Sequence, residues 1–89
     1  MTDTTYQGWS NRATWNVALW LNNDYGLYRG KEDLARRYRD SEDRADQLTA
    51  FAGDLRQYAK DTWPNGETPD NAKLSECNWR ELAQSEMEV

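Results

Sequence analysis

The sequence predicts an all-α fold, a small single domain of four or five short helices packed around a central helix rich in tryptophan. Three observations support this prediction. Apolar residues recur at intervals of three and four, which places them on one face of a helix. Side chains that cap helices stand before several of these stretches. Alternation of apolar and polar residues, the pattern of a half-buried strand, occurs over no useful length.

The chain has 89 residues, the length of one domain, so we expect a single helical domain over residues 1–89 with residues 1–7 and 86–89 loose. A domain this small depends on a few large side chains for its core. Five tryptophans, five tyrosines and one phenylalanine supply them, since each such side chain can bury roughly 150–250 Å². The charged residues, 30% of the chain, then form a heavily solvated surface.

The central helix is predicted within residues 8–24, GWSNRATWNVALWLNND. Ser10 or Asn11 can cap its start, because their side-chain oxygens accept hydrogen bonds from free backbone amides of the first turn. Trp15, Ala18 and Leu19 share one face of the helical wheel, and Val17, Trp20 and Leu21 cover most of the rest. The polar residues of the helix form one strip: Arg12, Asn16 and Asn23. Because the helix is apolar nearly all round, we expect it to be surrounded by protein.

The second helix is predicted over residues 24–39, where Leu27 and Leu34 belong to a set of apolar residues at helical spacing. Gly26 and Gly30 weaken the prediction, since each costs about 1 kcal/mol relative to alanine inside a helix. The alternative is that Gly30 divides this segment into two shorter helices.

The third helix, predicted over residues 42–63, has the clearest pattern in the chain. Asp40 and Ser41 precede it as capping residues, and Pro64 and Gly66 end it. Its apolar residues form one stripe: Leu48, Phe51, Ala52, Leu55, Ala59 and Trp63.

Two further helices are predicted after Gly66. Thr68 is placed to cap a short helix with Pro69 in its first turn. Asn78 and Glu81 have the spacing of a capping box, in which each side chain accepts a hydrogen bond from the other residue's backbone N–H. They begin the last helix, whose inward face consists of Trp79, Leu82, Ala83 and Met87.

Two blocks of the sequence resemble a known family. The first comprises residues 8–15 (GWSNRATW) and 19–24 (LWLNND), and the second comprises residues 78–83 (NWRELA). They are similar to the opening and closing segments of a family of small proteins of uncharacterised activity from phages, plasmids and other mobile elements. The resemblance implies an origin in a mobile element, and it implies no activity, cofactor or site residue.

The charge of the chain limits its partners. The formal net charge is −5, with acidic and basic residues mostly interleaved. Direct binding to nucleic acid or to an anionic membrane needs a cationic face, so we expect neither partner. The single cysteine, Cys77, is typical of a reducing compartment. No segment resembles a secretory signal or reaches the ~20 apolar residues of a spanning helix, so we expect the protein in the cytoplasm of a host cell.

Few residues of the chain could perform catalysis. It has no histidine, so Cys77 cannot pair with an imidazole, and zinc sites of the Cys/His type are excluded. The glycines lack the lysine and hydroxyl spacing of a phosphate-binding loop. The carboxylates are predicted to point mostly outward, where no shared cleft separates the pKa values of an acid and a base. We therefore expect no enzymatic activity, no metal and no cofactor, and a buried, unreactive Cys77.

One outward face of the third helix carries an acidic row: Asp43, Asp46, Asp54 and Asp61. One interpretation is a surface that mimics DNA and occupies a basic site on a host enzyme. DNA carries one charge per ~1.7 Å of its axis, whereas about 10 Å of helix without a carboxylate separates Asp54 from Asp61. This spacing favours the alternative, an ordinary solvated helix face.

Tryptophans and polar residues give the other candidate contacts. We expect Trp15 and Trp79 in the core. Trp20 and Trp63 lie near predicted helix ends, where they could form either a contact surface for a partner or part of the structure. The polar strip of the central helix could contact a partner or hydrogen-bond to neighbouring loops, and we favour the structural role.

Two functions remain. The first is a non-enzymatic protein that binds a host protein complex and inhibits a defence or nucleic-acid-processing system, as an anti-CRISPR or anti-restriction protein does, by occluding a basic or an assembly surface. The second is a self-associating structural or regulatory accessory protein of a phage. The first function predicts an acidic monomer that captures a host complex, and the second predicts a homodimer.

Overall fold

The all-α prediction is confirmed. A computed structural model describes residues 8–39 and 44–87 as four α-helices and one short 3₁₀ helix. These elements are α1 (Arg12–Asn23), α2 (Tyr25–Arg39), α3 (Arg44–Thr62), the 3₁₀ helix η1 (Leu74–Glu76) and α4 (Trp79–Met87). Within the described residues no strand forms, and no helix has both the length and the apolar character needed to cross a membrane.

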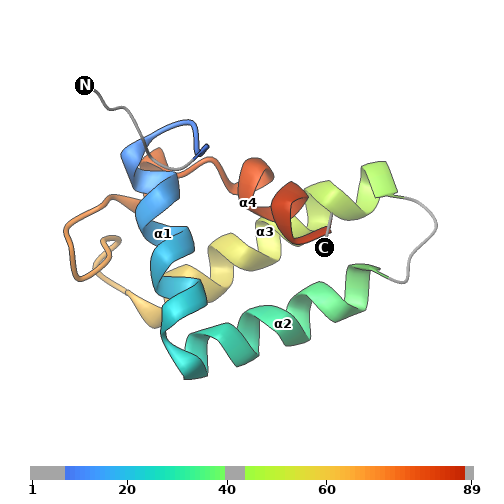
Figure 1. The fold of residues 1–89 in the computed structure, drawn as a ribbon, viewed down its shortest axis with the longest axis horizontal. Coiled ribbons are helices and arrows are strands. Elements are labelled where there is room, and N and C mark those ends of the chain that lie inside the picture. Colours follow the sequence, from blue (N-terminus) through green and yellow to red (C-terminus); the bar gives the residue numbers. More distant parts are fainter. Residues whose placement is uncertain (1–7, 40–43, 88–89) are drawn as a thin grey trace.

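The helices pack around one core (Figure 1). The long helices α2 and α3 run antiparallel, and α1 stands across one end of this pair. The short helix α4 packs against α3, and α1 reaches α2, α4 and η1. Residues from all four α-helices form the centre of the core: Val17, Leu21, Ala35, Phe51, Leu55, Ala59 and Ala83.

Protein covers much of α1 but not all of it, and its buried residues are Ala13, Thr14, Asn16, Val17, Ala18 and Leu21. Val17, Ala18 and Leu21 face the core, whereas Leu19 is exposed and Trp15 is half-buried. The expectation that protein surrounds this helix is therefore wrong, and Trp15, expected in the core, is only half-buried. An apolar helical wheel predicts burial on every side, but this small domain leaves part of α1 exposed.

The first two helices follow each other without a loop. Asn11 caps α1, since its Oδ1 accepts the Thr14 backbone N–H at 2.8 Å. After α1 ends, Asp24 Oδ1 accepts the Leu27 N–H at 3.1 Å and so serves the start of α2. One aspartate therefore forms the whole connection between the two helices.

Gly30 does not interrupt α2, which is continuous from Tyr25 to Arg39. The Tyr58 side chain of α3 lies directly against Gly30, where an added Cβ would stand 2.2 Å from the phenolic oxygen. The hydroxyl of Tyr58 donates to the backbone carbonyl of Leu27 at 3.1 Å. Gly30 is therefore needed for the close approach of α3 to α2, although it weakens the helix locally.

The helix α3 begins at Arg44 in the described part of the chain, and the capping residues expected at Asp40 and Ser41 lie outside it. Phe51, Leu55 and Ala59 of the predicted stripe are fully buried. The period of the apolar residues therefore located this helix and its inward face correctly.

No helix forms at Thr68 and Pro69, so that prediction is wrong. Thr68 is buried and holds a turn in which its Oγ1 accepts the Ala72 N–H at 3.1 Å. Asn71 has φ +68°, a left-handed conformation that ends a helix rather than continuing one. The threonine therefore performs the capping chemistry of a turn, and the short helix η1 follows six residues later.

Asn78 caps α4, where its Oδ1 accepts the Glu81 N–H at 3.0 Å. The reciprocal half of the capping box is absent, because the backbone N–H of Asn78 donates to the Thr14 hydroxyl at 2.8 Å. The Glu81 carboxylate accepts the Ser10 hydroxyl at 2.7 Å instead. The two blocks that carry the family resemblance thus hydrogen-bond to each other across the start of α1 and the start of α4.

The C-terminal turn of α4 is anchored. Met87 is buried, and the Glu86 side chain is 14% exposed within an ion-pair cluster. The expectation of a loose end from Glu86 onward is therefore wrong for these two residues. Residues 1–7 and 88–89 of that expectation lie outside the described residues.

Candidate functional site

The acidic row of the third helix has four members in different surroundings. Asp43 lies outside the described residues, and Asp46 lies near the start of α3. Asp61 is exposed, and its Oδ1 accepts the Gln57 side-chain amide at 3.0 Å. Asp54 is half-buried and accepts the hydroxyl of Tyr38 from α2. Asp54 is therefore partly covered, whereas the sequence predicted a solvated outward position.

The acidic residues instead gather along a groove between α2 and α3, with a volume of about 410 Å³. Asp33 of α2 lines it together with Asp54 and Asp61 of α3, and Arg37 is the cation among its lining residues. Asp33 was not among the predicted site residues, because the register of two helices cannot be read from the periodicity of either one. We call this site the acidic groove.

Tyr58 forms part of the wall of the acidic groove beside Gly30. Burial raises the pKa of Tyr58, and the negative charges of Asp24 and Asp33 raise it further. The hydrogen bond to Asp54 raises the pKa of Tyr38, and burial acts in the same direction. Both phenols therefore stay neutral at physiological pH.

Trp20 and Trp63, the tryptophans expected near helix ends, contact each other. Their ring centroids are 6.5 Å apart at an interplanar angle of 74°, an edge-to-face arrangement. Trp63 also packs against the core, and the indole N–H of Trp20 donates to Asp70 Oδ2 at 3.1 Å. Both side chains are half-buried, and each has a contact within the protein.

The polar strip of α1 holds a loop. Arg12 donates to the backbone carbonyl of Asp70 at 2.9 Å, and Asn16 donates to its Oδ2 at 2.9 Å. Asn16 is fully buried, and its own Oδ1 accepts the Thr68 hydroxyl at 2.6 Å. Asn23 is exposed at the end of α1. The structural role favoured for the strip is therefore observed for Arg12 and Asn16.

Asp70 is the acceptor that organises this loop. Hydrogen bonds from Asn16 and then from Trp20 lower the pKa of Asp70, and the nearby charge of Arg12 acts in the same direction, against a small effect of desolvation. No sequence motif identifies Asp70, because its partners Arg12, Asn16 and Trp20 lie at least 50 residues earlier in the chain. We call Asp70 with Arg12, Asn16 and Trp20 the Asp70 contacts.

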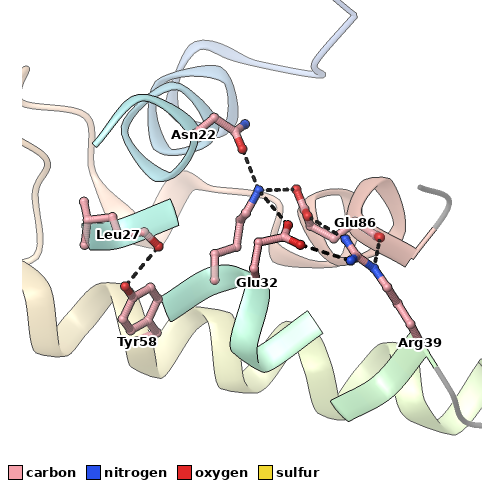
Figure 2. A network of polar contacts seen from close by, with 7 residues as sticks. Asn22, Leu27, Glu32, Arg39, Tyr58 and Glu86 are labelled. Atoms are coloured by element: carbon pink, nitrogen blue, oxygen red, sulfur yellow. Dashed lines mark hydrogen bonds and ion pairs between the residues drawn. The ribbon is translucent and has the colours of Figure 1, made fainter. Parts of the chain in front are cut away.

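An ion-pair cluster around the buried Lys31 joins α1, α2 and α4 (Figure 2). The side chain of Lys31 is 4% exposed; its Nζ lies 2.6 Å from Asn22 Oδ1 and 3.0 Å from Glu86 Oε2. Arg39 contacts a carboxylate oxygen of Glu32 at 3.1 Å and one of Glu86 at 3.2 Å. Arg39 also donates to the backbone carbonyl of Glu86 at 3.0 Å. We call these five residues the Lys31 cluster.

Sequence analysis missed the Lys31 cluster, although the sequence carries a signal for it. Lys31 lies four residues after Leu27 and four before Ala35, so it is a cation within the apolar stripe of α2. Burial raises the pKa of Glu32, but the hydrogen bond and charge of Arg39 and the charge of Lys31 outweigh it, and that pKa is lowered. Glu32 is therefore ionised at neutral pH.

Cys77 is buried at the end of η1, and burial raises the pKa of its thiol to about 12. The thiol is protonated at neutral pH and therefore a poor nucleophile or metal ligand. Among the described residues, no three aspartate, glutamate or cysteine side chains come together as metal ligands would.

Comparison with known proteins places the chain in a family. No curated protein and no solved structure matches it. The model of a family of unknown function, DUF7249, matches residues 2–89, nearly the whole chain. The Asp70 contacts, the Lys31 cluster and the acidic groove all fall within the matched residues, and we conclude that the chain belongs to the DUF7249 family of unknown function.

Proposed function

We propose that this protein is a non-enzymatic binding module from a phage or another mobile element, and that its acidic groove docks on a basic surface of a host protein complex. One observation carries the proposal: Asp33, Asp54 and Asp61 line a single groove, with Arg37 as the cation among its lining residues. The partner is a defence or nucleic-acid-processing complex, since such complexes expose the basic surfaces that bind nucleic acid. Binding inhibits the complex by occluding that surface.

The acidic groove is a better binding site for a basic protein segment than a row of aspartates on a single helix would be. Carboxylates from two helices face the same space, so an arginine or lysine inserted there meets negative charge from both walls. The groove also has an apolar part, from Leu34 and the Tyr58 ring, which can cover the aliphatic stem of such a side chain. The absence of histidine from the chain and the raised pKa of Cys77 support a function without catalysis.

The test begins with the capture of partners from host lysate on the immobilised protein and their identification by mass spectrometry. Binding of the captured complex is then measured for Asp33→Asn/Asp61→Asn and for the matched control Glu67→Gln/Glu76→Gln. Each pair changes the formal net charge by +2, from −5 to −3. Asp54 is left unchanged because it accepts the Tyr38 hydroxyl.

The groove variant is expected to lower the association rate constant at least tenfold, and the control to lower it less than threefold. Added salt should weaken binding of the unaltered protein more than binding of the groove variant. Equal effects of the two pairs would show that only net charge matters and would contradict docking at the groove.

A second function, self-association as an accessory phage protein, is favoured by a separate observation. Leu19, Tyr25 and Tyr28 are large side chains left exposed near the junction of α1 and α2, with Tyr25 72% exposed. Exposed aromatic residues of this kind are enriched at protein interfaces. Sedimentation equilibrium of Tyr25→Ser and the unaltered chain tests it: a dimer that the substitution dissociates supports this function, and a monomer at all concentrations rejects it.

A further inference from the structure

A second groove lies on the other flank of α3, between that helix and the segment that follows it. Its volume is about 290 Å³. Arg56 and Lys60 line it from α3, one helical turn apart, and Lys73 lines it from the opposite wall. The chain as a whole is acidic, with a net charge of −5, so its average charge conceals this local group of cations.

The cations of this groove differ from most of the others that the structure describes. Lys31, Arg36 and Arg39 form ion pairs, and Arg12, Arg29 and Arg80 donate hydrogen bonds. Among described cationic side chains, those for which neither contact is found are Arg37, Arg56, Lys60 and Lys73. Three of these four line the same groove.

Placing three cations together is unfavourable unless an anion joins them. Arg56 and Lys60 stand at positions i and i+4 of a helix, an arrangement in which like charges repel. The fold fixes Lys73 opposite them, because its residue pairs with Glu67 in an isolated antiparallel bridge and Leu74 beside it is buried. The backbone therefore holds the three residues on the two walls of the groove, and repulsion between their charges cannot move their Cα atoms apart.

Neutral hydrogen-bonding groups share the lining. Ser75 contributes a hydroxyl. Asn65 accepts the Glu67 N–H through its side-chain oxygen at 3.2 Å, which leaves its amide NH₂ as a donor. The Glu67 carboxylate is the one acidic group in the lining. Three cations and one carboxylate give the groove a formal charge of +2.

We propose that this groove binds the phosphate group of a small molecule as a dianion. A charge of +2 matches that of a phosphomonoester, and Arg, Lys, hydroxyl and amide donors are the groups that hold its oxygens in proteins. The volume is at the lower limit of small-molecule sites, which suits a phosphate with a small attached group. This inference is independent of the proposed docking at the acidic groove, which lies on the opposite flank of α3.

The proposal is tested by titrating the ¹⁵N-labelled full chain with inorganic phosphate at pH 8, with sodium chloride adjusted to constant ionic strength. Saturable shifts are expected for the backbone amides of Lys60, Gly66 and Ser75. Shifts that fail to saturate by about 20 mM phosphate, or that are as large around Arg29 and Arg36 of α2, would overturn the proposal.

Two double variants separate the groove from general charge. Lys60→Gln/Lys73→Gln and the matched control Arg29→Gln/Arg36→Gln each change the formal net charge by −2, from −5 to −7. The groove variant is expected to raise the dissociation constant for phosphate at least tenfold, and the control less than twofold. Equal effects overturn the proposal. All four positions are exposed, and a dispersed spectrum checks that each variant folds; Arg56→Gln, with the same expected weakening, provides an independent second test.

A single-stranded oligonucleotide, whose phosphodiesters each carry one charge, is the last probe. Under the proposal it competes with inorganic phosphate no better than its phosphate concentration predicts. If it shifts the same amides at a concentration far below that of inorganic phosphate, the groove is a nucleic-acid surface and the assignment to a small phosphorylated ligand is wrong.

Discussion

The Lys31 cluster and the Asp70 contacts join similarly distant parts of the chain by similar chemistry. In each, a carboxylate receives hydrogen bonds from a residue more than 50 positions earlier, Lys31 for Glu86 and Asn16 for Asp70. Their surroundings differ. Lys31 is 3% exposed and pairs with the carboxylates of Glu32 and Glu86. Asp70 is exposed, and its side-chain partners Asn16 and Trp20 are neutral.

This difference determines what each set of contacts contributes. Lys31 is almost inaccessible to water and Glu86 nearly so, so a charge left unpaired between these two residues is costly. Asp70 is exposed, so water can replace any donor that is removed. Its hydrogen bonds therefore position the loop but contribute less to the free energy of unfolding. We expect the Lys31 cluster to control global stability and the Asp70 contacts to control the order of residues 66–74.

The largest effect is expected for Lys31→Met. Removing one partner of a buried ion pair typically costs 3–5 kcal/mol, and Arg39 still faces Glu86, so a loss of about 3 kcal/mol is expected. Equilibrium urea unfolding measures it. Adding Glu86→Gln should recover at least about 1 kcal/mol of this loss, because the carboxylate would no longer be left partly unpaired.

The exposed ion pair between Arg36 and Asp33, with side chains 73% and 59% exposed, provides the control. Arg36→Ala should change the free energy of unfolding by less than about 0.5 kcal/mol. A loss for Lys31→Met as small as this would mean that burial does not distinguish the cluster from surface pairs.

Asn16→Ala is expected to have the next largest effect. It leaves the buried Thr68 hydroxyl without its acceptor and frees the Asp70 loop, at a cost of about 2 kcal/mol. Asn23→Ala changes an exposed residue of the same strip and should cost less than about 0.5 kcal/mol. If the two variants were equally stable, the buried hydrogen bonds of Asn16 would contribute nothing to the free energy of unfolding.

Asp70→Ala should destabilise the protein less than Asn16→Ala, although both remove the same hydrogen bond. Its distinct result is local: amide hydrogen exchange of residues 66–74 should become faster, while that of α2 and α4 stays unchanged. Faster exchange throughout the molecule would show that the Asp70 contacts support global stability, as the Lys31 cluster does.

The smallest effect is expected from mild acid. The folded-state pKa values of Glu32 and Asp70 are lowered from their usual values of 4.5 and 3.8. Their stabilisation is therefore complete above those usual values and is lost as the pH falls through the lower, folded-state values. Unfolding free energy should fall below about pH 4.5, and Glu32→Gln should flatten the upper part of that decline.

The sequence predicted what depends on one segment at a time. The apolar period located α1, α2 and α3, and the Asn78 side chain identified the start of α4. The error at Thr68 has a local cause, since a capping residue serves a turn as well as a helix and no apolar period follows it to decide between them.

Contacts between segments could not be predicted in the same way. Whether Asp54 faces water or Tyr38 depends on the angle and register between α2 and α3, which neither helix encodes alone. The same holds for Asp33 in the acidic groove and for Asp70 against α1. Lys31 is the exception, because a cation within an apolar stripe is visible in the sequence and indicates a buried partner.

The hydrogen bonds between the start of α1 and the start of α4 have a consequence for synthesis on the ribosome. Ser10 finds its acceptor 71 positions later, and the Thr14 hydroxyl accepts from a residue 64 positions later. When α1 leaves the exit tunnel, these partners have not yet been translated. We therefore expect the nascent chain to remain unfolded, with its apolar side chains accessible to chaperones, until residues 78–87 emerge. The native structure should then form in one late step.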